Sequence, residues 1–369
     1  MKRFLFQSVA ALTGIALFFG SCTKERSADI PAVSQQNEEA VLKTEADKTV
    51  SDQQQTTSAF ERDFTGMMGG NIAARHQQNI VQIAQSLPVF KSLVAAVVKT
   101  GLAGTLSSAS LNATVFAPAD AAFAKLPAPF NNAANISGIT NPAQIEALKS
   151  ILLYHVLGTE VRRNQIAAGR SSAVTLNTGK IYFSNSLGLL FVNGNSLVLI
   201  ANVDASNGII HVIDDVLLPP SQTIAQIAVG NPAFSSLVAA LSKTNLVGVF
   251  TGAGDFTVFA PTDAAFAKLP APFNNAANIS AITNQTQIDA LANILKYHVS
   301  GSRYFAWDFG IFNSIPTLAA PSSNTLRGIL GFDNGWIKGK SNATFSKAQP
   351  VNILATNGVV HVMDQVLLP

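Results

Sequence analysis

Hydrophobic residues recur along this chain with two different periods, which predict both helices and strands. In one stretch the apolar residues lie three or four positions apart, on one face of a predicted helix: Phe234, Leu237, Val238 and Leu241. Asn231 followed by Pro232 is typical of a helix start. Residues 257–260 are β-branched, aromatic or small, as in a buried strand, and Pro261 ends that strand. Because strands and helices do not alternate regularly, we predict an α+β fold.

A longer helical pattern occurs twice and ends each time in a tyrosine followed by a histidine. Its apolar stripe is Ile145, Leu148, Leu152 and His155 in one copy, and Ile288, Leu291, Leu295 and His298 in the other. Asn141 and Asn284 stand where each helix is expected to begin. Later in each copy an Asn-Gly pair, at residues 207–208 and 357–358, precedes an apolar run, which is typical of a hairpin turn before a strand.

These paired patterns belong to an internal repeat of domain size. Residues 114–137 and 257–280 match at every one of their 24 positions except Ala119 against Thr262. A repeat of roughly 145 residues is far too long for a solenoid unit and is the size of a whole domain. We therefore predict two tandem domains, residues 78–219 and 221–369.

The first 21 residues have the three parts of a secretory signal peptide. Two basic residues begin it, residues 4–19 are almost entirely apolar, and small residues precede Cys22. This arrangement resembles a bacterial lipoprotein signal, which implies that a diacylglycerol group is attached to the thiol of Cys22 after cleavage. Lys24 and Glu25 resemble the charged surface-export tags of Bacteroidetes-type lipoproteins. That resemblance implies the outer membrane or cell surface of a Gram-negative bacterium; an ordinary signal peptide is the alternative.

Residues 22–77 differ in composition from the repeat that follows. Runs such as 34–39 and 51–58 are polar and contain few large apolar residues, so they cannot form a core of their own. We interpret the whole segment as a polar, flexible tether with an end-to-end distance of about 40 Å.

Charge and cysteine content exclude several classes of function. Removal of Lys2 and Arg3 with the signal leaves 22 of the 24 basic residues against 21 acidic ones, and no dense basic run is present. No nucleic-acid partner is therefore expected. Cys22 is the single cysteine of the chain, so neither an internal disulfide nor a thiolate metal cluster can form.

The repeated motifs together resemble the fasciclin domain. They are the strand-and-helix segments at residues 114–123 and 257–266, the Tyr-His pairs, and the closing segments at 207–219 and 357–369. The resemblance implies a wedge of two β-sheets flanked by helices in each copy. It also implies a secreted or membrane-anchored protein that works in adhesion or matrix contact. In the same family the Tyr-His pair is linked to receptor adhesion, which would assign partner binding to Tyr154, His155, Tyr297 and His298. A buried, structural role for these four residues is the alternative that their leucine-rich helical face favours.

Neither metal binding nor catalysis finds support in the motifs. The five histidines have no HExxH or helical metal-ligand spacing: His76, His155, His211, His298 and His361. Nucleophile elbows and phosphate loops are lacking, and Asp214 and Asp215 are adjacent strand residues whose side chains point to opposite faces. We therefore expect no cofactor, no metal and no enzymatic activity.

The middle of the second copy departs from the first through an aromatic cluster that includes Tyr304, Phe305, Trp307, Phe309 and Phe312. Such a cluster either anchors a longer loop in the fold or offers an exposed platform for a sugar or a peptide. The sequence thus predicts a non-catalytic surface module that binds extracellular protein or matrix. A carbohydrate-binding lipoprotein is the alternative.

Overall fold

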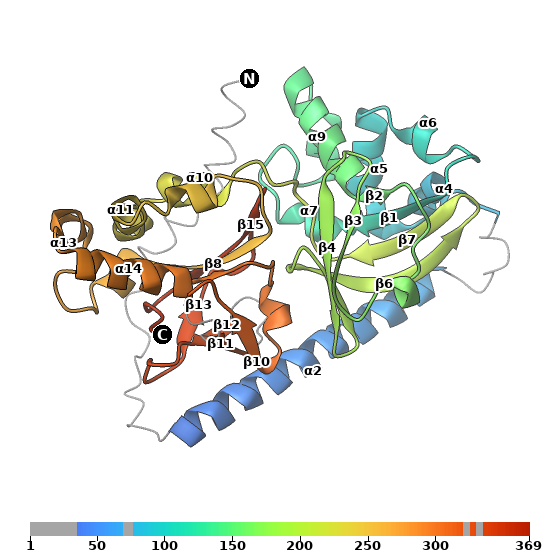
Figure 1. Cartoon of the computed structure of the whole chain (residues 1–369). Coiled ribbons are helices and arrows are strands. Elements are labelled where there is room, and N and C mark those ends of the chain that lie inside the picture. Colours follow the sequence, from blue (N-terminus) through green and yellow to red (C-terminus); the bar gives the residue numbers. More distant parts are fainter. Residues whose placement is uncertain (1–34, 69–76, 320–324, 330–334) are drawn as a thin grey trace. The chain divides into compact units, whose positions relative to one another are not determined.

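The computed structural model describes residues 35–68, 77–319, 325–329 and 335–369, which divide into two compact units (Figure 1). Of these residues, 51–68 and 77–219 belong to the first unit, and 35–50 and the residues from 220 onwards belong to the second. Each unit contains one copy of the repeat and combines helices with a sheet. The predicted α+β class with two tandem domains is confirmed. The signal peptide, Cys22 and His76 lie outside the described residues.

Seven strands form the sheet of the first unit in the order β2-β1-β7-β6-β5-β4-β3. Their bounds are β1 (Ala113–Pro118), β2 (Val156–Leu157), β3 (Gly169–Val174), β4 (Lys180–Ser186), β5 (Leu189–Val192), β6 (Ser196–Ala205) and β7 (Gly208–Ile213). The first strand, β1, pairs in parallel with the last, β7, so that Phe116 lies opposite His211. The register shifts twice along β6, and in Figure 1 β3 and β4 run across the direction of β1 and β7. The long β6 therefore joins the two halves of the wedge.

Eight strands form the sheet of the second unit in the order β10-β11-β12-β13-β15-β8-β9, and β14 also pairs with β15. Their bounds are β8 (Phe256–Pro261), β9 (Val299–Ser300), β10 (Ile311–Pro316), β11 (Thr325–Ile329), β12 (Gly335–Lys338), β13 (Ser346–Ala348), β14 (Ile353–Ala355) and β15 (Gly358–Met363). Again the first and last strands are parallel neighbours, with Phe259 opposite His361.

Each unit also contains α-helices and short 3-10 helices. In the first unit they are α4 (Ile80–Ser86), η1 (Pro88–Phe90), α5 (Lys91–Lys99), α6 (Ala103–Leu106), α7 (Asp120–Ala124), α8 (Ala133–Ser137), α9 (Pro142–Tyr154) and η2 (Arg163–Gln165). In the second unit they are α10 (Ile224–Gly230), η3 (Pro232–Phe234), α11 (Ser235–Lys243), η4 (Val247–Phe250), α12 (Asp263–Phe266), α13 (Ala276–Ala281), α14 (Gln285–Tyr297) and η5 (Ala306–Phe309).

Side-chain caps begin these helices where the sequence predicted them. Asn141 accepts a hydrogen bond from the Ala143 amide at the start of α9, and Asn284 accepts one from the Gln287 amide at the start of α14. Such caps supply acceptors for amides that have no partner within the helix. Asp263, the first residue of α12, binds a different helix from its own. Its Oδ1 accepts the Ser236 amide hydrogen at 2.7 Å, in the first turn of the neighbouring helix α11.

Two hydrophobic clusters fill each unit. In the first unit one cluster lies between the helices and the β1–β7 half of the sheet and includes Phe90, and the other lies among the strands around Phe116. The second unit repeats this arrangement, with Phe234 in the helical cluster and Phe259 among the strands. Each domain therefore has a core of its own.

The predicted flexible tether is wrong for residues 35–68, which form the single helix α2 (Gln35–Met68). Its apolar residues are sparse, yet three of them are buried: Leu42 and Ala46 are 6% and 2% exposed, and Phe64 is 3% exposed. Phe64 joins the helical core cluster of the first unit, where its ring lies 6.4 Å from that of Phe90. Burial of this side chain stabilises a segment whose composition alone would leave it unfolded.

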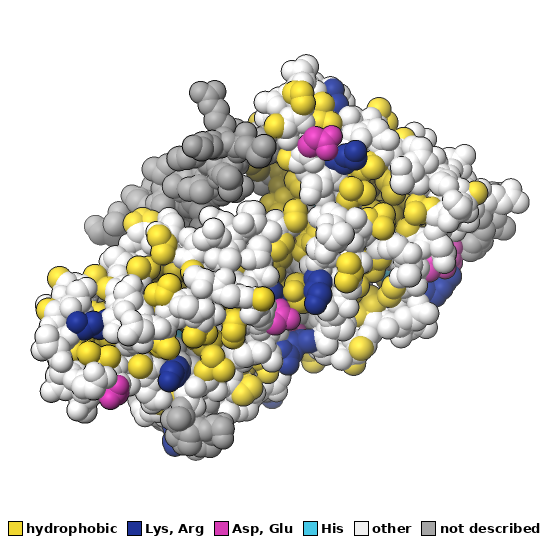
Figure 2. Space-filling model, turned by 45° about the horizontal axis from the view of Figure 1, so that its top comes forward, with side chains coloured by type: hydrophobic (Ala, Val, Ile, Leu, Met, Phe, Trp, Pro, Cys, Tyr) yellow, Lys and Arg dark blue, Asp and Glu magenta, His cyan; other side chains and the backbone are white. Residues whose placement is uncertain are grey.

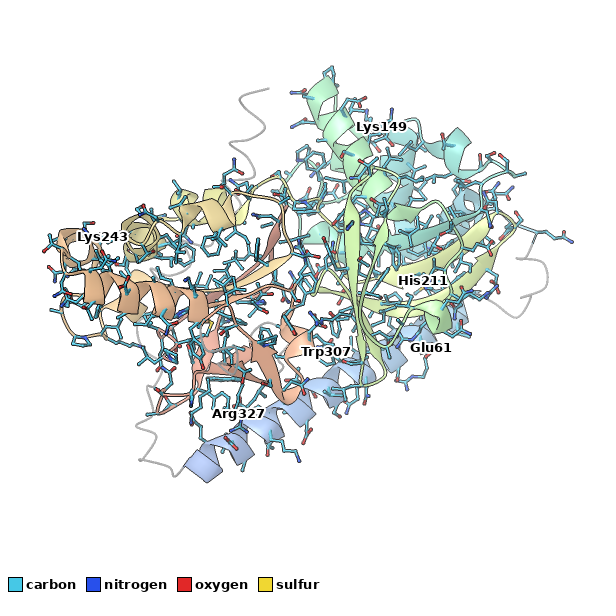
Figure 3. All side chains as sticks on the ribbon, in the orientation of Figure 1. Glu61, Lys149, His211, Lys243, Trp307 and Arg327 are labelled. Atoms are coloured by element: carbon cyan, nitrogen blue, oxygen red, sulfur yellow. The ribbon has the colours of Figure 1, made fainter. Side chains whose placement is uncertain are left out.

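The start of α2 belongs to the second unit and is fixed there by two acidic side chains. Glu39 forms an ion pair with Arg327 on β11 at 2.5 Å, and Glu38 accepts the amide hydrogen of Phe345 at 3.0 Å. Arg327 is labelled in Figure 3 beside this helix.

Candidate functional site

The Tyr-His pairs that end α9 and α14 lie in the interior of their domains. Tyr154 and Tyr297 are fully buried, and His155 and His298 are each 2% exposed. His155 Nδ1 donates to the carbonyl oxygen of Ile151 at 2.8 Å, and its Nε2 accepts the amide hydrogen of Leu217 at 2.8 Å. This pairing selects the neutral ring with its proton on Nδ1. The predicted burial of both histidines is confirmed.

His298 repeats these contacts in the second domain. Its Nδ1 donates to the carbonyl oxygen of Ile294 and its Nε2 accepts from the amide of Leu367, both at 2.8 Å. Burial lowers the pKa of His155 and of His298 from 6.5 to about 4, against the opposing effect of the hydrogen bond to the helix carbonyl. Each ring joins the end of a helix to the chain segment that follows the last strand.

The tyrosine hydroxyl of each pair also forms hydrogen bonds within its own domain. The hydroxyl of Tyr154 donates to the Lys180 carbonyl oxygen at 2.6 Å and accepts from Asn193 Nδ2 at 3.2 Å. The hydroxyl of Tyr297 donates to the Thr325 carbonyl oxygen at 2.8 Å and accepts from the Lys340 amide at 2.9 Å. The partner-binding role implied for Tyr154, His155, Tyr297 and His298 is therefore corrected: their side chains face the interior, and they fix the sheet to the central helix.

A second pair of buried histidines, which the sequence analysis did not single out, lies on the last strand of each domain. His211 Nε2 donates to the Val161 carbonyl oxygen at 2.9 Å, and its Nδ1 accepts the Asn202 amide at 3.3 Å. His361 makes the same two contacts, with Tyr304 at 2.8 Å and Asn352 at 3.3 Å. Burial lowers the pKa of both rings, that of His361 to about 4. One histidine in an otherwise apolar strand, present in both copies, is the signal that would have identified them.

His211 and His361 also donate hydrogen bonds to the loop whose sequence differs most between the two copies. Val161 and Tyr304 are equivalent residues, because their amides donate to Thr114 Oγ1 and Thr257 Oγ1 at the same distance of 2.7 Å. The next residues in the first domain form the polar η2, where Arg162 makes an ion pair with Asp204 at 2.7 Å. In the second domain the equivalent residues form η5, which is apolar.

The aromatic residues of η5 point into the second domain, so the expected exposed platform is wrong. Phe305 and Trp307 are each 2% exposed, and Phe309 is fully buried in the strand-side core. Trp307 is labelled on the short helix in Figure 3. Tyr304 is half-buried and packs against the same core, whereas the Phe312 side chain lies outside the described residues. The cluster anchors its loop in the fold, as the other interpretation of the sequence held.

Arg303, which the sequence analysis overlooked, fixes the start of this loop. The residue is 6% exposed, and its Nε donates to Asp255 Oδ1 at 2.7 Å. Its Nη1 donates to the carbonyl oxygens of Ala355 and Gly358. A guanidinium group can make such charge-assisted hydrogen bonds in several directions at once, which is why arginine suits this buried junction.

The adjacent acids of the first domain have separate structural roles. Asp214 accepts the Leu197 amide at 2.7 Å, and burial together with the charge of Asp215 raises its pKa to about 6. Asp215 forms an ion pair with Lys125 at 2.8 Å. Both acids follow the end of β7 at Ile213, so the prediction that they are strand residues is wrong.

No group of three metal-ligating side chains occurs among the described residues. Within the same part of the chain, no single helix has both the length and the hydropathy for a membrane span. Two sharply bent pairs of helices meet these criteria only when their segments are combined, α4 with Pro88–Lys99 and α10 with Pro232–Lys243. Figure 2 shows charged side chains widely spaced over the visible face, without a dense basic patch.

Comparison with known proteins agrees with this architecture. The profile of the fasciclin domain matches residues 88–219 and 232–369. Pig transforming growth factor-beta-induced protein ig-h3 is 29% identical over 259 residues, which covers 69% of this chain and 34% of that protein. Protein sll1483 of Synechocystis is 38% identical over 160 residues, covering 43% of this chain and 79% of that protein. The chain thus spans about a third of the length of the vertebrate relative, at 34%.

A solved pair of FAS1 domains from the insect cell adhesion molecule fasciclin I is also similar. It is 20% identical, with 76% of this chain and 97% of that chain covered and a TM-score of 0.37. The two profile matches include nearly all strands and helices of both units described above. The chain therefore belongs to the fasciclin-domain family, of which it contains two tandem copies.

Proposed function

We propose that this chain is a non-catalytic adhesion module of the cell surface that binds extracellular protein or matrix. The observation that carries the proposal is the presence of two fasciclin domains, matched over residues 88–219 and 232–369. The chemistry of the interior supports it, because the four buried histidines use both ring nitrogens in hydrogen bonds to the backbone. Such saturated groups have no capacity left for acid–base catalysis.

A partner would therefore bind at the outer surface, and the residues of that surface differ between the two domains. At η2 the first domain presents Arg162, whose side chain is 45% exposed, whereas the equivalent residue of the second domain is the buried Phe305. Exposed loops on a rigid framework are common binding positions. The glycan-binding alternative relied on exposed aromatic residues, and the burial of Phe305 and Trp307 removes its basis.

Cells that carry the chain are expected to attach to surfaces coated with a matrix protein at least tenfold better than cells that lack it. Two linked domains that engage one coated surface can raise avidity by roughly 10²–10⁴. The measurement is the number of cells retained under flow on a panel of individually coated proteins. Soluble chain should compete with attachment. Equal retention with and without the chain on every coating would contradict the proposal, and competition by free oligosaccharides alone would favour glycan binding.

We also propose that the thiol of Cys22 carries a lipid that anchors the chain to the outer membrane or cell surface. The position of Cys22 directly after Gly20 and Ser21 supports this anchor. The Cys22→Ala variant is expected to move from the membrane fraction to the soluble fraction, because each lost acyl methylene removes about 0.8 kcal/mol of membrane affinity. Fractionation with immunodetection measures the shift. A variant that stays wholly with the membrane would show that Cys22 is not the anchor.

A further inference from the structure

An open groove of about 720 Å³ lies on the first domain between α4 and α5. The chain bends by 105° between α4 and the segment Pro88–Lys99, which separates the two helices and leaves this space. Its wall combines apolar residues such as Leu87, Pro88, Val94, Ala95 and Val98 with the polar and charged residues Gln85, Lys91, Lys99 and Ser137. Val98 is 61% exposed, so its side chain is accessible to a ligand in the groove. The volume falls within the range of small-molecule sites, roughly 300–1,000 Å³.

A small apolar cavity of about 30 Å³ lies beneath this groove and shares part of its wall. Ala84, Gln85, Val94 and Val98 line both spaces. The deeper wall is formed by core residues such as Leu152, and its one ionisable side chain, His155, has both ring nitrogens in hydrogen bonds to the backbone. An apolar cavity of this kind stays dry and accepts apolar groups. The groove thus shares part of its wall with an apolar space suited to the end of a hydrocarbon chain.

The charge at the groove is positive. Lys91 and Lys99, at the two ends of α5, line it, and none of its lining residues is acidic. A helix of this length separates the two lysines by about 12 Å. Asp120 accepts the amide hydrogen of Ser92, the residue after Lys91, at 2.7 Å and does not line the groove.

The second domain has an equivalent cavity, but the residues equivalent to the groove lining differ in polarity and charge. Its cavity of about 20 Å³ is lined by the equivalent elements, including Leu295 and His298. By the alignment of Phe90 with Phe234, however, Leu87 is replaced by Asn231 and Val98 by Ser242. Lys91 is replaced by Ser235, whose hydroxyl donates to Asp263 at 2.7 Å. Lys243, the equivalent of Lys99, donates to the Ser280 carbonyl oxygen at 3.0 Å. The second domain is therefore a natural control within the same chain.

We propose that the groove of the first domain binds a single-chain anionic amphiphile of the fatty-acid class. Its carboxylate pairs with Lys91, the charge that only this domain has. Its hydrocarbon chain lies along Val94, Ala95 and Val98, and its end approaches the cavity lined by Val94 and Val98. This site goes beyond the proposed adhesion function and does not depend on it.

Displacement of a dansyl-labelled fatty acid from the purified full-length chain tests the proposal, with decanoate as the competitor. Decanoate should displace the probe about tenfold better than decyltrimethylammonium, because the cation meets lysines instead of a counter-charge. Shortening decanoate to octanoate should weaken binding by about fivefold, since two methylenes leave a partly buried site. Lys91→Ser, which copies the second domain, should weaken decanoate binding by about threefold to fivefold. Lys149→Ser on α9 removes the same charge outside the groove (Figure 3) and should leave binding unchanged.

Ala95→Phe fills the groove from its half-buried wall and should abolish displacement while the melting temperature stays within a few degrees. Chemical-shift changes on adding decanoate should map to α4 and α5 and not to α10 and α11. The proposal would be overturned by equal binding of the anionic and cationic competitors, by full binding to Ala95→Phe, or by shifts confined to the second domain. Binding to anionic phosphatidylglycerol vesicles without any binding of decanoate would also overturn it, in favour of a membrane surface.

Discussion

Replacement of Phe309 by alanine should lower the free energy of unfolding of the second domain by about 3–5 kcal/mol. The Phe309 side chain is fully buried, and its ring lies 5.8 Å from that of Phe259 and 5.0 Å from that of His361. The change would leave a cavity between β8, β15 and η5 that these rings cannot fill. Since a domain is typically stable by only 5–15 kcal/mol, the loss would be large.

Tryptophan fluorescence during urea denaturation measures this effect in the intact chain. Both tryptophans, Trp307 and Trp336, lie in the second domain, so their emission reports its unfolding alone. Leu318→Ala is the matched control, because Leu318 is 43% exposed and its loss should change stability by less than about 1 kcal/mol. An equally small effect of Phe309→Ala would mean that η5 is not part of the core and would restore the aromatic segment as a candidate surface.

Acidification should unfold the second domain between about pH 6 and pH 4. Burial lowers the pKa of His298 and of His361 to about 4, from 6.5. Because the folded pKa is below the unfolded one, their contribution to stability is complete above pH 6.5 and is lost as the pH falls toward 4. Each histidine changes the free energy of unfolding by about 1 kcal/mol per pH unit in this window. Together they remove on the order of 6 kcal/mol, comparable with the stability of a whole domain.

The first domain should respond less steeply because one group acts in the opposite direction. The pKa of Asp214 is raised to about 6, so its contribution favours folding at low pH and is lost as the pH rises through about 6. Between pH 4 and 6 it offsets part of the loss caused by His155 and His211.

Urea denaturation at a series of pH values, again followed by tryptophan emission, gives the slope for the second domain. His361→Gln should lower stability at pH 7 and reduce the slope by about 1 kcal/mol per pH unit, since one titrating group is gone. A slope unchanged by His361→Gln and by His298→Gln would show that these rings do not cause the acid sensitivity.

The sequence alone was sufficient for most of the architecture. The near-identical segments at 114–137 and 257–280 established two domains, and capping residues such as Asn141 and Asn284 marked helix starts that the structure reproduces. Local signals of this kind are decided by neighbours a few positions away. The burial of His155 could likewise be predicted, because it shares a helical face with leucines.

Other features depend on contacts between segments that are distant along the chain, so the sequence could not predict them. Phe305, Trp307 and Phe309 alternate with period two, but this spacing does not show whether their common face is buried or exposed, so a buried anchor and an exposed platform leave the same trace in the sequence. The apolar residues of α2 are too sparse to predict a helix, and Phe64 becomes decisive only because Phe90 is beside it. The shared wall of the groove and cavity between α4 and α5 likewise arises from a bend that composition does not encode.

The parallel pairing of first and last strands has a consequence for how each domain is made. During synthesis β1 emerges about 95 residues before β7, the partner it pairs with from Ala113 opposite Gly208 onwards. Because β7 lies between β1 and β6 in the sheet, the β2–β1 pair and the β6–β3 part can join only when this late strand arrives. The helices can form earlier, but only part of the sheet against which they pack would then be present. The sheet of the first domain can therefore be completed only after nearly the whole domain has been synthesised, because its central strand lies close to the domain's end.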